Sequence, residues 1–237
     1  MYRIFCSVLA SLLLAGCQFT RLPSTPVPTE YFNFDQNNST LVILLPGFGD
    51  APNRFVEHGT VDQIKACNPQ ANILGVDAHF GYYRKRSIDR RLSDDVIDPA
   101  LRSGIDQIWI LGISMGGMGS ILYRSFYPEK LTGIILMAPF VGDRDELKLY
   151  LDDRAQAVQE VESGFIKIWD GLVNIPVDNP SITLAYGEED GLRPQIEWLA
   201  GLLGDDRVIS APGGHNWRVW KQLWPEALQR SGLCTVQ

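Results

Sequence analysis

The sequence lacks an excess of basic residues: 21 Lys and Arg stand against 28 Asp and Glu, which gives a formal net charge of -7. Such a chain has no global basic surface to follow a phosphate backbone, and it contains no zinc-finger or heptad pattern, so we expect no nucleic-acid partner. It also lacks internal repeats, which excludes solenoids and propellers. The chain has 237 residues, of which 45% are hydrophobic and 21% charged, and this balance is typical of one globular domain with a single core.

A long apolar run is also missing. The run at 4–15 is shorter than the about 20 residues that a transmembrane helix needs, and it is typical of the hydrophobic region of a secretory signal. At its end, Leu14-Ala15-Gly16-Cys17 resembles the lipobox of bacterial lipoproteins, whose cysteine is acylated, as with palmitate, and becomes the new N-terminus. The resemblance implies a signal peptide at 1–16 and stable membrane attachment through lipidated Cys17.

Two alternatives to the lipid anchor stay open: an uncleaved anchor, and a signal peptide cut elsewhere. By resemblance to lipoproteins of Gram-negative bacteria, Gln18 after the cysteine implies the bacterial cell envelope, at the outer membrane facing the periplasm. The membrane leaflet and the oligomeric state are not indicated.

Cysteine is scarce, with four in the chain. Cys6 leaves with the signal and Cys17 is the lipidation candidate, so Cys67 and Cys234 are the thiols left in the mature chain. No metal-type spacing joins them, and we expect no metal site. In an exported protein they are able to form a disulfide, but the sequence does not decide whether they do.

The segment 17–40 is rich in Pro, Thr, Ser and Asn, and we expect it to be a tether ahead of a domain at 41–237. Within that domain, short continuous apolar runs alternate with amphipathic segments. Continuous runs are typical of strands buried on both faces, and the intervals suit crossover helices, which predicts an α/β fold with a mostly parallel sheet covered by helices on both faces. The runs are 41–45, 72–76, 108–111, 133–137, 182–185 and 207–210.

The interval 141–180 is longer than one crossover helix needs. It is either an ordinary helix with an extra loop or a small cap over the active site.

Glycines on both sides of a serine mark the candidate nucleophile. Gly112-Ile113-Ser114-Met115-Gly116 matches G-x-S-x-G, with a buried-strand run before it and a helical pattern at 115–126 after it. A serine on such a strand–turn–helix junction is exposed at the sheet edge, and the glycines leave room where neighbouring backbone comes close. The alternative is a glycine-rich turn without chemistry.

Four motifs, in this order, resemble those of the α/β-hydrolase family, especially its small carboxylesterases and thioesterases. They are Pro46-Gly47-Phe48-Gly49-Asp50, Gly112-Ile113-Ser114-Met115-Gly116-Gly117, Gly187-Glu188-Glu189-Asp190 and Gly214-His215. The resemblance extends over 41–228 and implies that family's fold, with the optional cap lying between strands 6 and 7. The chain departs from the family at Pro46-Gly47, where relatives commonly have His-Gly.

Histidine is scarce too, and this narrows the choice of base. Of three histidines, His58 and His79 precede Ser114, whereas the family order is serine, acid, histidine. His215 is therefore the candidate base that takes the serine proton.

The acid that orients the imidazole is expected to be Asp190, directly after the apolar run 182–185. Glu188 and Glu189 are rivals in the same loop. Asp143, after the preceding apolar run 133–137, is a further alternative, because some relatives carry the acid after that strand.

The oxyanion of the reaction needs backbone N–H donors, and by position these are expected from Met115 and, through the resemblance, from Phe48. Phe140, Trp169 and Trp217 are candidate substrate-binding residues, because they are apolar and lie near loops of the expected active edge. Each is also a plausible core residue.

These features predict a serine hydrolase that cleaves a carboxylic ester or thioester through an acyl-Ser114 intermediate, with no metal or organic cofactor. An acyltransferase would use the same residues. The alternative from another class is a lipoprotein that keeps the fold as a binding or assembly module and leaves the serine unused.

Overall fold

The computed structural model describes residues 21–178 and 180–234, so the expected signal peptide and Cys17 lie outside the described residues. Seven strands form one sheet in the order β1-β3-β2-β4-β5-β6-β7. All neighbouring pairs are parallel except β1 with β3. The strands are β1 (Thr29–Asn33), β2 (Thr40–Leu45), β3 (Ala71–Val76), β4 (Gln107–Ile113), β5 (Gly133–Met137), β6 (Ser181–Gly187) and β7 (Val208–Ala211).

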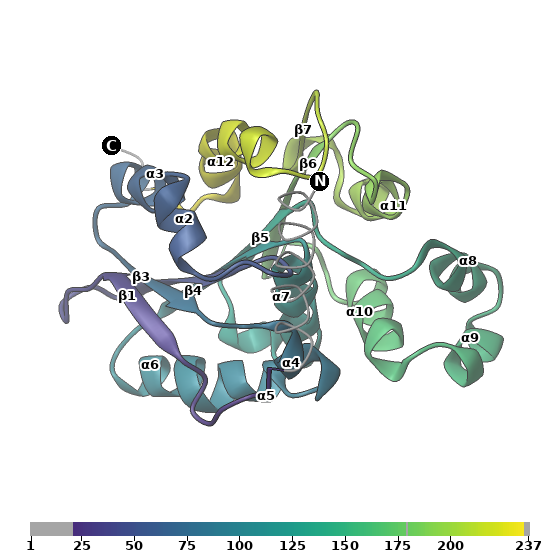
Figure 1. Cartoon of the computed structure of the whole chain (residues 1–237), viewed down its shortest axis with the longest axis horizontal. Helices are drawn as coiled ribbons and strands as arrows, with labels where there is room; N and C mark the ends of the chain where they lie inside the picture. Colours follow the sequence, from purple (N-terminus) through teal and green to yellow (C-terminus); the bar gives the residue numbers. More distant parts are fainter. Residues whose placement is uncertain (1–20, 179, 235–237) are drawn as a thin grey trace, which may run out of the picture.

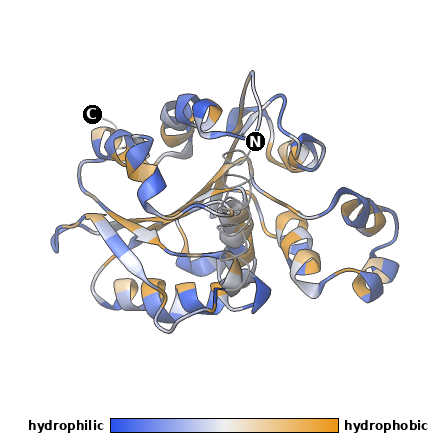
Figure 2. Cartoon of the chain, in the orientation of Figure 1, coloured by the Kyte–Doolittle hydropathy of each residue, from blue (hydrophilic) through white to orange (hydrophobic). Residues whose placement is uncertain are grey.

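The six predicted apolar runs all form strands, and the mostly parallel α/β sheet is confirmed. Every residue of β2, β3 and β5 is buried, as expected for strands covered on both faces. Figure 2 shows this as an apolar sheet inside helices whose outer faces are hydrophilic.

Helices cover both faces of the sheet. In Figure 1, α2, α3 and α12 lie on one side and α4, α5, α6 and α7 on the other. None of the helices in 21–178 and 180–234 combines the length and the hydropathy of a membrane-spanning segment. Apart from the three helices of the interval 141–180, the helical elements are α2 (Asn53–Glu57), α3 (Thr60–Cys67), α4 (Phe80–Arg84), α5 (Ile88–Leu92), η1 (Ser93–Ile97), α6 (Asp98–Arg102), α7 (Met115–Phe126), η2 (Pro128–Lys130), α11 (Arg193–Leu203), η3 (Asp205–Arg207) and, after the last strand, α12 (Trp217–Ser231).

The edge strand β1 corrects the expected tether. β1 pairs antiparallel with β3, and just before it Val27 is buried and donates its N–H to Asp95 Oδ2 at 2.8 Å. Arg21 also forms an ion pair with Asp77. From Arg21 onward this segment therefore packs on the domain, a contact that the sequence does not indicate because β1 is short, half polar and largely exposed.

The long interval at 141–180 holds three helices, α8 (Arg144–Asp152), α9 (Arg154–Glu160) and α10 (Ser163–Asn174). It separates β5 from β6, not a sixth from a seventh strand, because only β6 and β7 follow it in this sheet. Figure 1 shows α8 and α9 projecting from the body, while α10 lies beside α7.

A buried arginine anchors the C-terminal end of this insertion. Arg124 of α7 is fully buried, and its guanidinium donates to the carbonyls of Pro180 at 3.1 Å and Pro176 at 2.6 Å. Burial lowers the pKa of Arg124 to about 10. Carbonyl oxygens thus replace the water that this cation loses on folding.

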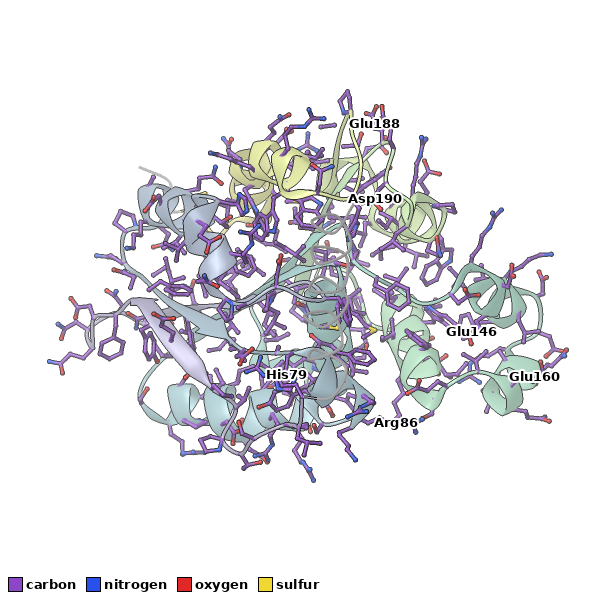
Figure 3. All side chains as sticks on the ribbon, in the orientation of Figure 1. His79, Arg86, Glu146, Glu160, Glu188 and Asp190 are labelled. Carbon is purple, nitrogen blue, oxygen red and sulfur yellow. A yellow bond between two sulfur atoms is a disulfide. The ribbon has the colours of Figure 1, made fainter. Side chains whose placement is uncertain are left out.

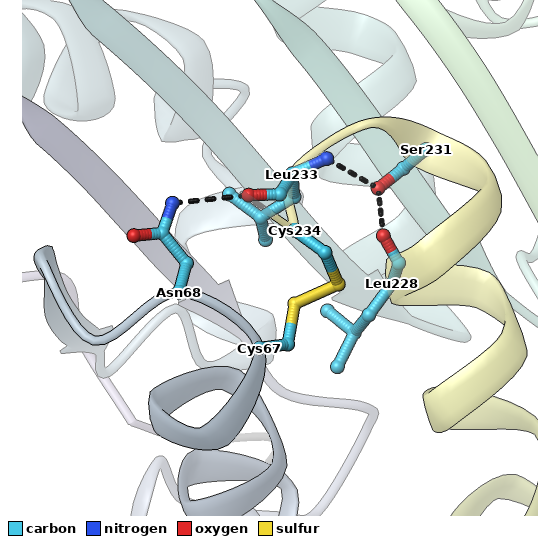
Figure 4. Close-up of a disulfide and its surroundings, with 6 residues drawn as sticks. All are labelled: Cys67, Asn68, Leu228, Ser231, Leu233 and Cys234. Atoms are coloured by element: carbon cyan, nitrogen blue, oxygen red, sulfur yellow. Dashed lines mark hydrogen bonds between the residues drawn. A yellow bond between two sulfur atoms is a disulfide. The ribbon is translucent and has the colours of Figure 1, made fainter. Parts of the chain in front are cut away.

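A disulfide joins Cys67, at the end of α3, to Cys234, beyond α12, with a Cα–Cα distance of 4.8 Å (Figure 4). Beside it, Asn68 Nδ2 donates to the carbonyl of Leu233 at 3.0 Å. The bond that the sequence left open is therefore formed in this structure, and it closes a loop with a sequence separation of 167.

Candidate active site

Ser114 lies on a sharp turn between β4 and α7. Its φ of 51° and ψ of -113° are unfavourable for a residue with a side chain, so the surrounding structure must hold it there. Its N–H donates to the carbonyl of Met137 at 2.9 Å, and its own carbonyl accepts from the N–H of Phe140 at 3.0 Å. The neighbouring strand β5 and the loop after it therefore fix the turn, with Ser114 only partly buried.

The glycines around Ser114 are needed for close packing. A Cβ at Gly112 would lie 2.3 Å from the carbonyl oxygen of Gly116. A Cβ at Gly116 would lie 2.1 Å from the carbonyl oxygen of Leu45, at the end of β2. Both distances are shorter than real contacts allow, so the first turn of α7 sits against β2 only because these positions lack side chains.

An acid–base pair lies at the same carboxyl edge of the sheet. Asp190 follows β6 and His215 follows β7, and Asp190 Oδ2 lies 2.7 Å from His215 Nδ1. The Asp190 side chain is fully buried, and its Oδ1 accepts the backbone N–H of Leu192 at 2.8 Å. Figure 3 shows Asp190 in the loop beyond β6. Both carboxylate oxygens thus have a partner, so the orientation of the Asp190 carboxylate relative to the His215 imidazole is fixed.

The two loops of this pair pack closely. A Cβ at Gly187 would lie 2.2 Å from the carbonyl oxygen of Gly213, and Glu189 donates its N–H to the same carbonyl at 2.9 Å. The ring of Trp220, from the first turn of α12, meets the His215 ring edge-on at 4.9 Å between centroids. The imidazole therefore has a protein contact on one side and the carboxylate at Nδ1.

The rival acids are placed elsewhere. Glu188 is exposed and its Oε1 accepts from Ser210 Oγ at 3.0 Å, and Glu189 is exposed as well. Asp143 caps the N-terminus of α8, where it accepts the N–H of Asp145 at 2.8 Å. Of the four candidate acids, Asp190 is the one that contacts His215.

The described residues show no hydrogen bond between the candidate nucleophile and the candidate base. Among the hydrogen bonds of residues 21–178 and 180–234, none joins the Ser114 hydroxyl to His215. Catalytic hydrogen bonds of ligand-free enzymes are often long and tighten when substrate binds. The structure thus pairs His215 with Asp190 and places Ser114 at the end of β4, at the same edge.

The two expected oxyanion donors come from adjacent segments. Met115 is the first residue of α7, where N–H groups have no carbonyl within the helix to bond. The loop with Phe48 passes beside Ser114, because a Cβ at Gly47 would lie 3.6 Å from Ser114 Cβ. Phe48 itself is half exposed and contacts Phe80 edge-on. The segments of both expected donors therefore lie beside Ser114.

The three aromatic residues expected in the pocket have different environments. Phe140 lines a pocket of about 520 Å³. Trp169 is fully buried and donates its Nε1–H to the carbonyl of Val141 at 2.7 Å, so it supports the neighbouring Phe165 from behind and does not face the pocket. Trp217 donates its Nε1–H to Asp50 Oδ2 at 2.8 Å, so this hydrogen bond joins the start of α12, just after His215, to the loop that contains Phe48.

The other two histidines have structural contacts away from this pair. His58 stacks on Trp217 with ring centroids 4.4 Å apart, and burial lowers the pKa of His58. His79 caps α4, accepting the N–H of Gly81 at Nδ1, and burial followed by the charge of Arg21 lowers the pKa of His79. Within the described residues, no group of three or more His, Cys, Asp or Glu side chains is placed to hold a metal ion.

Sequence reasoning missed three features of the site. The N–H of Leu192 that holds Asp190 and the ring of Trp220 beside His215 both depend on how loops fold back, which no local pattern encodes. The pocket residues Met118 and Leu122 did carry a signal, because they follow Ser114 at helical spacing on one face of α7.

Solved structures with this fold include hydrolases. A ferulic acid esterase superposes with a TM-score of 0.60 at 13% identity, over 90% of this chain and 96% of that one. The S-formylglutathione hydrolase FrmB of Staphylococcus aureus gives 0.58 at 13% identity, over 88% and 98%. FphF, a fluorophosphonate-binding serine hydrolase of the same organism, gives 0.54 at 15% identity, over 88% and 89%. At such identities these similarities show a shared fold.

No curated protein sequence matches the chain. The sequence model of the alpha/beta hydrolase fold matches residues 40–168, which is more than half of the chain and includes β2 to β5 and the Ser114 turn. The chain therefore belongs to the α/β-hydrolase fold family.

Proposed function

We propose that this protein is a serine hydrolase that cleaves a carboxylic ester or thioester through an acyl-Ser114 intermediate. The observation that carries the proposal is the buried Asp190 carboxylate held 2.7 Å from His215 Nδ1, at the same sheet edge as the strained Ser114 turn. A carboxylate at Nδ1 keeps the proton on that nitrogen, so that Nε2 is free to accept one.

In the first half of the reaction, His215 Nε2 takes the hydroxyl proton while Ser114 Oγ forms a bond to the carbonyl carbon. The carbonyl oxygen becomes an anion, stabilised by the N–H groups of Met115 and Phe48. When this intermediate collapses, the bond to the alcohol or thiol breaks, and the imidazolium gives its proton to the leaving group. Asp190 stabilises the imidazolium throughout.

In the second half, water takes the place of the leaving group. His215 removes a proton from water, the oxygen attacks the acyl carbon, and the acid is released as Ser114 recovers its proton. An alcohol acceptor in place of water would turn the same steps into acyl transfer.

Two neighbours support ester and thioester chemistry. By their names, one of the solved structures is an esterase of ferulic acid and another hydrolyses S-formylglutathione, an ester and a thioester reaction on this fold. The superpositions cover 96% and 98% of these two chains, so the shared fold extends over nearly the whole of each hydrolase.

The test is hydrolysis of p-nitrophenyl acetate and of an acetyl thioester by the wild type, Ser114→Ala and Ser103→Ala. Ser103 follows α6 and bonds to its own helix, so its variant is a matched control. We expect Ser114→Ala to lose activity by about a thousandfold or more, and Ser103→Ala to keep it. Equal activity of the wild type and Ser114→Ala would refute the proposal.

A second candidate is a binding or assembly module with an unused serine. Such a protein would keep the fold without using Ser114. A correctly folded protein that hydrolyses neither substrate would support it.

We also propose that the domain is tethered to a membrane of the bacterial envelope through lipidated Cys17. The sequence motif supports this, and the Cys67–Cys234 disulfide fits an oxidising compartment. Labelling with an alkyne palmitate analogue in a bacterial host should mark the wild type and not Cys17→Ser. Labelling of both proteins, or of neither, would contradict the anchor.

A further inference from the structure

A pocket of about 520 Å³ lies between α4, α7 and α10. This volume is within the range of small-molecule sites, and most of the lining is apolar. Its apolar wall includes Phe80, Met118, Leu122, Phe126, Phe140 and Phe165.

The inner end of the pocket adjoins the nucleophile. The backbone N–H groups of Met118 and Phe140 both donate to the carbonyl oxygen of Ser114, at 3.1 and 3.0 Å. Both residues line the pocket. Two residues of the lining are therefore hydrogen-bonded to the backbone of Ser114, so the pocket lies beside the Ser114 turn.

The pocket continues along one face of α7. Met118, Leu122 and Phe126 recur at intervals of four residues, which places them in a row about 12 Å long. The facing wall comes from α10, where Phe165 meets Phe140 edge-on at 5.8 Å. An apolar trough about 12 Å long fits an extended aliphatic chain along its length.

Exposed charged residues line the outer end of the pocket. Arg86, beyond α4, forms an ion pair of 2.9 Å with Glu162 at the start of α10, and both line the pocket. Arg86 has a φ of 49°, which a residue with a side chain adopts only under constraint. Lys167 lies over the Phe126 ring at 4.2 Å. Figure 3 shows Arg86 on the side of the molecule where α10 lies.

We propose that this pocket holds the acyl group of the substrate, and that the enzyme prefers unbranched aliphatic acyl chains of medium length, about eight to ten carbons for a trough of about 12 Å. The proposal rests on the proposed function, because the chain is attached through Ser114. The acyl group stays bound through both halves of the reaction, whereas the alcohol must leave to solvent. A largely apolar pocket fits the first group, and the half-exposed Phe48 fits the exit of the second.

The first test is a series of p-nitrophenyl esters from acetyl to dodecanoyl. We expect kcat/KM to rise by about threefold to fourfold per methylene, the gain from burying a CH₂, until the chain reaches Arg86 and Glu162, and then to fall. A profile that is flat, or that falls from acetyl onward, would overturn the proposal. So would a rise along a series of alkyl acetates with no rise in the acyl series, because the pocket would then hold the alcohol.

Variants of the wall separate this pocket from general hydrophobicity. Leu122→Trp fills the middle of the row and should lower the octanoyl-to-acetyl ratio of kcat/KM at least tenfold. Leu202→Trp is the matched control, since Leu202 is a partly buried leucine of α11 outside the pocket. An unchanged ratio in Leu122→Trp, or an equal fall in Leu202→Trp, would contradict the assignment.

Variants of the outer end test the length limit. Arg86→Ala and Glu162→Ala should each move the preferred chain to longer esters, whereas Lys85→Ala, an exposed neighbour that does not line the pocket, should not. A limit that stays in place in both variants would show that the ion pair does not set it.

The outcomes keep the two proposals apart. If a folded sample hydrolyses neither esters nor thioesters, the proposed function fails. If short esters are hydrolysed and chain length has no effect, the function stands and the pocket assignment fails.

Discussion

Asp190→Asn tests the orientation of His215 with almost no change in shape. In the wild type, Oδ1 accepts the N–H of Leu192 and Oδ2 lies against His215 Nδ1. An asparagine at this buried position must keep its oxygen toward the Leu192 N–H, since the opposite orientation would bring two donors together. Its NH₂ group then faces Nδ1.

An NH₂ donor at Nδ1 forces the proton of neutral His215 onto Nε2. That tautomer has no free electron pair for the Ser114 proton, and an amide does not stabilise an imidazolium. We therefore expect kcat to fall by about a thousandfold to ten-thousandfold, or about 4 to 5.5 kcal/mol of transition-state stabilisation.

The assay is steady-state hydrolysis of p-nitrophenyl acetate, with circular dichroism to establish folding. Glu188→Gln is the matched control, because it makes the same carboxylate-to-amide change at an exposed residue of the same loop. It should keep its rate. An Asp190→Asn variant that folds and remains within tenfold of the wild type would refute the role of Asp190.

Three further predictions concern stability. Reducing the Cys67–Cys234 bond, which spans 167 residues of sequence, should destabilise the wild type by up to about 5 kcal/mol in urea unfolding and leave Cys234→Ser unaffected; a wild type insensitive to reductant would contradict this. Arg124→Met should lower the free energy of unfolding by about 2 to 4 kcal/mol, because buried carbonyls lose their donors, and a loss below 1 kcal/mol would count against that role. Burial lowers the pKa of His79, so the unfolded chain binds its proton more readily and the folded state loses stability as the pH falls below about 6.5. His79→Asn keeps a capping side chain without this titration, so it should lose less stability than the wild type between pH 8 and pH 5.5; equal losses would contradict the prediction.

The fold and the Ser114 turn could be predicted because their signals are local. Continuous apolar runs identify strands buried on both faces, and the helix predicted at 115–126 has those bounds in the structure. His215 and Asp190 were predicted from the order of motifs, and the structure pairs them, although they are 25 residues apart. Local pattern and motif order together were therefore enough to name the residues that lie at the sheet edge.

Features that depend on tertiary packing could not be predicted. β1 is short and half polar, with Phe32 packed against the core, so it lacks the continuous apolar run that identifies the other strands. Arg124 looks like any charged helix residue until the carbonyls around it are known. Trp169 and Trp217 cannot be told apart by residue type. Only their hydrogen bonds show that Trp169 is a core residue and that Trp217 joins two segments of the site.

The central claim is that Ser114 is a nucleophile activated by His215. The most direct measurement is to treat the folded protein with a fluorophosphonate probe and to locate the adduct by mass spectrometry of its peptides. The account predicts one adduct, on Ser114, and none on any residue of Ser114→Ala. A folded wild type that stays unlabelled, or an adduct on a different residue, would contradict it.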